Sequence, residues 1–201
     1  MADSPASVFD DPRFHAFSKT GFQCSCGERH VGLFPLHMHL PKGWPGEAVY
    51  EPNSAIRMDG NFLSYDFSVL EGKYYAMRMR LPVAMHGVGP MVFMYTVWAG
   101  MNRPDFEAYV QATLNKTMDK NVKAPARLAN NISGFKPTSG LMGTAFQQED
   151  GGYPLLLLHG AQDANDPNHQ LLAEQRQGIS FDRVLELFSE YGHDMRAAAG
   201  A

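Results

Sequence analysis

The sequence predicts an α+β domain, in which an antiparallel sheet is flanked by one internal helix and two C-terminal helices. Three observations support this class. Strand-like segments follow one another through short turns between residues 54 and 100. A helical pattern interrupts them after residue 100, and the chain closes on two segments of helical periodicity. We expect residues 1–20 to be a lead-in segment and residues 21–195 to form a single domain.

Five segments have the composition and alternation of strands, namely residues 61–70, 73–85, 91–100, 141–149 and 153–160. In the second of them, one face carries Tyr75, Met77 and Met79. The other face carries Arg78 and Arg80, which predicts that this face is exposed to solvent. The third is almost wholly apolar, which predicts a central strand covered on both faces. Residues 115–127 have the polar composition of a connector.

Three helices are expected from capping residues and apolar spacing. Asn102 is a plausible N-cap for the internal helix. Pro167 suits the first turn of a second helix that runs to about Gln177. Ser180 caps the last helix and Gly192 ends it, with an apolar stripe at helical spacing between them, formed by Phe181, Val184, Leu185 and Phe188.

Composition excludes several classes of protein. The chain has 201 residues, a net charge of −4 and 44% hydrophobic residues, which suits a globular domain with a real core. It has no cluster of Lys and Arg of the kind that binds nucleic acid. No secretory signal and no apolar run long enough for a bilayer are visible, so we expect a cytoplasmic protein that binds neither nucleic acid nor membrane.

The chemistry concentrates in the stretch GFQCSCGERHVGLFPLHMHLP, residues 21–41, within a loop-like region that we expect to span residues 21–53. It holds both cysteines of the chain and three of its eight histidines. Thiolates and imidazoles are the ligands of structural zinc, and a glycine after the second cysteine permits a tight turn. The candidate metal ligands are Cys24, Cys26, His30, His37 and His39. A pair of free thiols in a turn beside surface histidines is the alternative.

Two enzymatic roles compete for the same residues. Cys24 and Cys26 could form a strained, easily reduced disulfide that serves thiol exchange, although no thioredoxin-like context surrounds them. Glu28 could act as the general base of a hydrolytic zinc site, although the helical H-E-x-x-H spacing is absent. Neither pattern is specific enough to name a reaction.

Several motifs, in this order, resemble those of a bacterial family known as domain of unknown function 2199. They are FQCSCGERHVGL, VWAGMNRPDFEAYV, ANNISGFKPTSGL and LLAEQRQGISFDRVLEL, which together cover most of the chain from Phe22 to about Tyr191. The family's opening pattern C-x-x-C-G-x-x-H-x-G-L-P falls on six residues of this chain: Cys24, Cys26, Gly27, Glu28, His30 and Gly32.

The chain departs from the family pattern in three places. The cysteines are spaced C-x-C, Ser68 stands where relatives often carry a further cysteine, and His169 is followed by Gln170 where H-P-L is usual. The resemblance implies a small cytoplasmic bacterial protein but no activity. We therefore expect a zinc-binding domain of unknown function that acts by binding another protein, with a metal-dependent hydrolase or thiol redox protein as the alternative. His37 or His39 is the expected fourth ligand.

Overall fold

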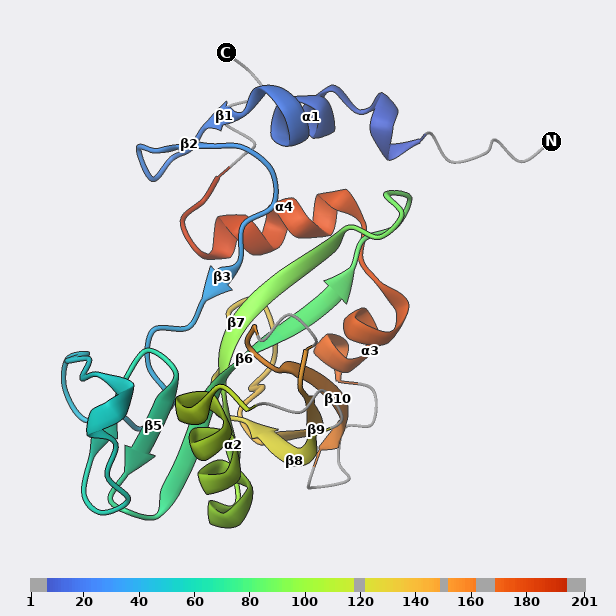
Figure 1. Cartoon of the computed structure of the whole chain (residues 1–201). Coiled ribbons are helices and arrows are strands. Elements are labelled where there is room, and N and C mark those ends of the chain that lie inside the picture. Colours follow the sequence, from blue (N-terminus) through green and yellow to red (C-terminus); the bar gives the residue numbers. More distant parts are fainter. Residues whose placement is uncertain (1–6, 118–121, 149–151, 162–168, 195–201) are drawn as a thin grey trace. The chain divides into compact units, whose positions relative to one another are not determined.

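The computed structural model describes residues 7–117, 122–148, 152–161 and 169–194. The chain divides into two compact units. The first comprises Met1–Leu36, Val83–Met94 and Ala173–Ala201, and the second comprises His37–Pro82 and Tyr95–Leu172. Figure 1 shows the elements of both units in sequence colours.

The protein is α+β with a sheet-rich core (Figure 1). Five strands, β7, β8, β9, β10 and β6, are hydrogen-bonded in that order, and a further β7–β6 pairing closes them into a barrel. Their bounds are β6 Tyr74–Ala84, β7 Val92–Met101, β8 Lys123–Leu128, β9 Leu141–Phe146 and β10 Leu155–Ala161. Short strands β3 Leu36–His37, β4 Phe62–Leu63 and β5 Phe67–Leu70 extend the sheet. A separate antiparallel pair is formed by β1 Phe22–Gln23 and β2 Arg29–His30.

The expectation of an antiparallel sheet is correct for most pairings but not for all of them. β10 runs parallel to β6, with Leu155 opposite Arg80. A ring of five strands cannot alternate direction all the way round, because five is odd. One parallel pair is therefore a consequence of closure, which also removes the exposed edges that an open sheet would present.

The predicted connector over residues 115–127 is wrong at its C-terminal end, where β8 begins. This strand buries Ala124, Ala126 and Leu128 and exposes the residues between them. Two of the three buried side chains are alanines, which have weak strand propensity, and Pro125 lies between them. The alternation was therefore hidden in the sequence by small residues.

The prediction that residues 78–80 expose their arginines to solvent is wrong for Arg78. Arg78 is only 6% exposed, and its guanidinium lies 4.8 Å from the centre of the Trp98 ring. It donates hydrogen bonds to the His39 carbonyl and to the Tyr50 hydroxyl. Stacking and hydrogen bonding thus compensate for the loss of hydration that burial of this charge entails.

The helices follow their capping residues. α2 spans Arg103–Asn115, and its N-cap Asn102 accepts a hydrogen bond from the Asp105 N–H. α4 spans Phe181–Glu190 and is capped by Ser180, as predicted. α3 spans Gln170–Gln177, whereas the start predicted at Pro167 lies outside the described residues. None of the helices in the described part of the chain is long and apolar enough to cross a bilayer.

The N-terminal residues form short helical turns that carry two buried phenylalanines. These turns are η1 Val8–Asp10, α1 Pro12–His15 and η2 Ala16–Thr20, and one further turn, η3 Asn53–Ala55, lies in the second unit. Phe14 packs edge-on against Phe181 of α4 at 5.2 Å between ring centres, and Phe17 lies 6.3 Å from Phe188. Both α4 residues belong to the predicted apolar stripe, which is buried along its whole length. The first unit therefore has an aromatic core shared by its N-terminal and C-terminal parts.

Replacing Phe188 by alanine should lower the free energy of unfolding by about 3–5 kcal/mol, because its fully buried ring would leave a cavity. The matched control is Phe9→Ala, since Phe9 is 61% exposed and should cost about 1 kcal/mol or less. Urea unfolding followed by circular dichroism measures both. Equal losses for the two variants would contradict the assigned core.

Candidate metal centre

The two cysteines lie in the tight turn of the β1–β2 hairpin. Phe22 is paired with His30 and Gln23 with Arg29, which leaves residues 24–28 to reverse the chain. The Cys24 N–H donates to the Glu28 carbonyl at 2.9 Å, and the Gly27 N–H donates to the Cys24 carbonyl at 3.0 Å. Gly27 has φ +91°, a conformation that residues with a side chain rarely adopt. The C-x-C spacing therefore fits a β-turn, which brings both thiols to one end of the hairpin.

His193 reaches the hairpin from the end of α4. The Gly192 N–H donates to the Ser189 carbonyl and the His193 N–H donates to the Phe188 carbonyl, each at 3.0 Å. These two bonds, with Gly192 at φ +77°, form a Schellman motif in which His193 is the residue after the terminal glycine. The helix ending therefore fixes the backbone of His193, and its ring lies 6.2 Å from that of Phe188.

Ser25, the residue between the two cysteines, joins the hairpin to this helix end. Its hydroxyl donates to the Gly192 carbonyl at 3.0 Å and accepts from the Asp194 N–H at 2.8 Å. These bonds hold the residues on either side of His193. The serine thus ties the cysteine turn to the backbone that carries the histidine.

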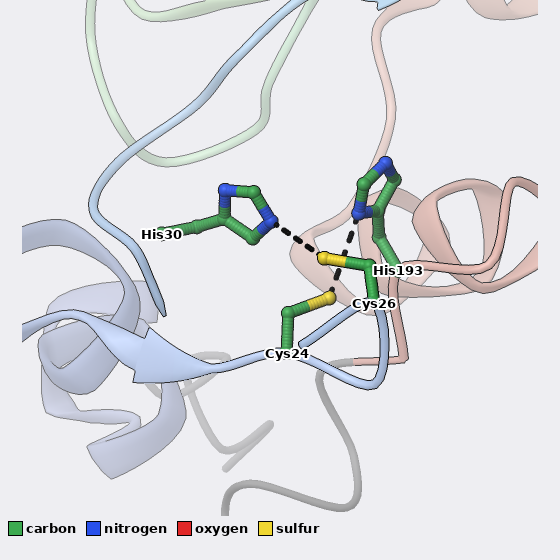
Figure 2. A group of neighbouring side chains, drawn as sticks. All are labelled: Cys24, Cys26, His30 and His193. Atoms are coloured by element: carbon green, nitrogen blue, oxygen red, sulfur yellow. Dashed lines mark hydrogen bonds between the residues drawn. The ribbon is translucent and has the colours of Figure 1, made fainter. Parts of the chain in front are cut away.

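Four side chains converge at this point: Cys24, Cys26, His30 and His193 (Figure 2). The Cys26 Sγ lies 3.2 Å from His30 Nε2, and the Cys24 Sγ lies 3.5 Å from His193 Nδ1. All four potential ligand atoms lie within 4.8 Å of one another. Around a tetrahedral zinc ion, sulfur and nitrogen ligands would be about 3.3–3.8 Å apart. The cluster could therefore hold a metal ion after small side-chain adjustments.

The imidazoles are packed against aromatic rings of the same unit. The His30 ring lies 4.4 Å from Phe34 and 5.2 Å from His193, and His193 lies 5.0 Å from Phe34. Phe34 in turn packs edge-on against Phe188 of α4 at 4.5 Å. The aromatic core therefore orients both imidazoles toward the thiols.

Burial changes the protonation of two members of this group. It raises the pKa of the Cys24 thiol, which is 5% exposed, so the protonated thiol is favoured in the absence of a metal ion. Burial, followed by the charge of His30, lowers the pKa of His193. The neutral imidazole that a metal requires is thereby favoured, and loading a metal would have to expel the Cys24 proton.

Three of the five ligands expected from the sequence, Cys24, Cys26 and His30, belong to the cluster. His37 and His39 are not among its four members, and they belong to the second compact unit. His37 is the last residue of β3. The His39 carbonyl accepts hydrogen bonds from Tyr50 at 2.9 Å and from the Trp98 indole at 3.1 Å. The Glu28 side chain is exposed and is not part of the cluster.

His193 is the ligand candidate that the sequence did not reveal. It lies more than 160 positions from the cysteines, and no spacing rule connects residues so far apart. A weak signal does exist, because Gly192 was expected to end the last helix and His193 follows it directly. The predicted helix end indicates that the backbone of His193 has a fixed conformation. It does not indicate that the side chain lies beside the cysteine turn.

One comparison with known proteins gives a match. A family model described as an uncharacterized protein conserved in bacteria (DUF2199) matches residues 23–179. This range includes Cys24, Cys26 and His30 and ends before His193. No curated protein and no solved structure matches the chain.

In metal-free protein, iodoacetamide should alkylate Cys26 faster than Cys24. Cys26 is exposed, whereas Cys24 is buried and has a raised pKa, and the thiolate is the reacting species. Mass spectrometry of peptides after timed alkylation in the presence of a chelator measures the two rates. Denatured protein is the control, in which the rates should converge. Equal rates in the folded protein would contradict the burial assigned to Cys24.

Proposed function

Because the chain belongs to the family of uncharacterized proteins conserved in bacteria (DUF2199), we propose a role that rests on its own Cys/His cluster and not on a known activity. Cys24, Cys26, His30 and His193 bind one zinc ion. The zinc is structural, and it fastens the β1–β2 hairpin to the C-terminal end of α4. The domain that it stabilises acts by binding another protein and is not an enzyme.

The observation that carries the proposal is the convergence of two thiols and two imidazoles within 4.8 Å. Two thiolates and two imidazoles form one of the common ligand sets of structural zinc. Such sites are almost always four-coordinate and tetrahedral. Softer metals such as Cu(I) also bind thiolates, but mixed sulfur and nitrogen ligands in tetrahedral positions favour zinc. Zinc is therefore the metal that we assign.

The β1–β2 hairpin is too short to be stable by itself, so a bound metal ion would stabilise it. Each of its strands has only two residues, and an isolated two-stranded hairpin is at best marginally stable in water. In such a segment the free energy of metal binding is also free energy of folding. The zinc would therefore order residues 22–30 and the end of α4 together.

The enzymatic alternatives have less support. A hydrolytic zinc keeps one coordination position open for water, whereas four protein ligands would close the site. Glu28, the expected general base, is exposed and lies outside the cluster. A redox cysteine needs a lowered pKa, whereas burial raises that of Cys24. With a net charge of −4, the expected partner is a protein and not a nucleic acid.

Protein purified without added metal should contain about one zinc ion per chain, measured by inductively coupled plasma mass spectrometry. Cys24→Ser, Cys26→Ser and His193→Ala should each weaken zinc binding by about 100-fold or more, since even neighbours of ligands cost 10- to 100-fold. His15→Ala is the matched control, because His15 is exposed and lies outside the cluster.

The same measurement tests the expectation that His37 or His39 completes the site. On the present proposal, His37→Ala and His39→Ala retain zinc. If either of these variants lost zinc while His193→Ala kept it in full, the fourth ligand would be His37 or His39 and not His193. Absence of zinc from the wild-type protein, with unchanged melting of both cysteine variants, would refute the structural metal.

Removing the zinc with a chelator should speed backbone hydrogen exchange in residues 22–30 and 192–194, because the two-residue strands of the hairpin and the residues after α4 are then held mainly by turn hydrogen bonds. Exchange in the centre of β7, where residues 95–99 are all buried, should change little and serves as the internal control. Hydrogen-exchange mass spectrometry measures both. Equal exchange in these two segments before and after chelation would contradict a structural role for the metal.

A further inference from the structure

A cavity of about 790 Å³ lies within the second compact unit. No member of the metal cluster lines it. Its walls come from β5, β6, β7, β8 and β9 and from the loop around Lys42. Several residues that line it are small, which leaves the space open: Ala76, Gly100, Ala126, Ala129 and Gly140. Its volume lies within the range of pockets that bind small organic molecules.

Three cations line this cavity and no carboxylate does. They are Lys42, Lys73 and Arg127, and all three are exposed. None of their side chains forms an ion pair or a hydrogen bond with another residue in the described part of the chain. By contrast, Arg57 and Arg103 of the same unit are each paired with a glutamate. The cavity therefore has a positive rim whose charges the described protein leaves uncompensated.

A buried hydroxyl also faces this space. Ser68 lines the cavity, is only 1% exposed, and lies on β5 opposite Ala76 of β6. The Ser68 hydroxyl forms no hydrogen bond within the described residues. Because Ser68 lines the cavity and a hydroxyl can both donate and accept, it is available to a polar group bound there.

The remaining walls are apolar. Leu70, Tyr75, Leu128 and Met142 line the cavity, and Tyr74, which is 66% exposed, lies at its border. Apolar walls with a few convergent polar groups are typical of sites for small organic ligands. An inorganic ion alone would gain nothing from these walls, whereas a ligand with an apolar body would bury its surface against them.

The cations are held on ordered backbone. The Lys42 N–H donates to the Ala129 carbonyl at 2.8 Å, and the Asn130 side chain donates to the Leu40 carbonyl at 2.8 Å. Arg127 lies between two strands, with Gly100 of β7 on one side and Met142 of β9 on the other. The Lys73 N–H donates to the Leu70 carbonyl in the turn before β6. The site is thus formed before any ligand arrives, which lowers the entropic cost of binding.

We propose that this cavity binds a small amphipathic anion, in which an apolar chain or ring carries a carboxylate or a phosphate group. The anionic group lies among Lys42, Lys73 and Arg127, and the apolar part lies along Leu70, Leu128 and Met142. Ser68 donates its hydroxyl to the ligand. The proposal is independent of the metal cluster, because none of the residues involved is a candidate zinc ligand.

Isothermal titration of the full-length protein with decanoate tests this site, with decyl phosphate as a second anion and decanol as the uncharged analogue. We expect saturable binding of at least one anion at one molecule per chain, and weaker binding of decanol. The better of the two anions identifies the group that the site prefers. Each titration is done with the zinc site as purified and after chelation, and the affinity for the anion should be the same.

The variant that removes the charge is the triple substitution Lys42→Gln, Lys73→Gln and Arg127→Gln, which should weaken anion binding by about 10-fold or more and leave decanol binding unchanged. Ser68→Ala should weaken it by about 3-fold. Lys19→Gln is the control for net charge, since Lys19 is exposed and lies in the other unit.

All three substituted cations are exposed, so the triple variant should retain the circular dichroism spectrum of the wild type. Three results would each overturn the proposal: no saturable binding of either anion, equal affinity in the wild type and the triple variant, or decanol binding as tightly as the anions. Equal weakening by Lys19→Gln would do so as well, because it would assign the effect to net charge and not to the cavity.

Discussion

The packing of α4 against the N-terminal phenylalanines is the interaction on which the candidate metal centre depends. Phe181 meets Phe14, Phe188 meets Phe17 and Phe34, and together they bury the apolar stripe of the last helix. Burial of each such ring is worth about 1.5–3 kcal/mol, more than any hydrogen bond in the cluster. This packing brings the end of α4 to the cysteine turn, and the Schellman motif and Ser25 then set the position of His193.

A metal at this point would connect parts of the chain that are far apart in the sequence. Cys24 and His193 are separated by 169 positions, so a shared ion restricts the unfolded chain in the way that a long-range cross-link does. The hairpin supplies three candidate ligands from a segment of seven residues, and the end of α4 supplies the fourth. The aromatic core and a bound metal would therefore be complementary, since the core positions the candidate ligands and the metal would hold a hairpin too short to be stable alone.

Sequence patterns predicted the α+β class, most strands and the caps of the internal and last helices, because alternation, helical spacing and capping are local properties. They missed β8, whose buried residues are mostly alanines, and the parallel pairing of β10 with β6, which follows from barrel closure. Cys24, Cys26 and His30 were predicted as one site because they share a short motif. His193 was missed because its position is set by the packing of α4 against the N-terminal phenylalanines. No local sequence pattern predicts that long-range contact.

We propose that two cysteines and two histidines hold one zinc ion in a closed site. X-ray absorption spectroscopy at the zinc edge of the purified protein measures this ligand set. We expect two sulfur ligands at about 2.3 Å and two nitrogen ligands at about 2.0 Å, with one nitrogen fewer in His193→Ala. A site with one sulfur or none, or with an oxygen of water in the fourth position of the wild type, would contradict it.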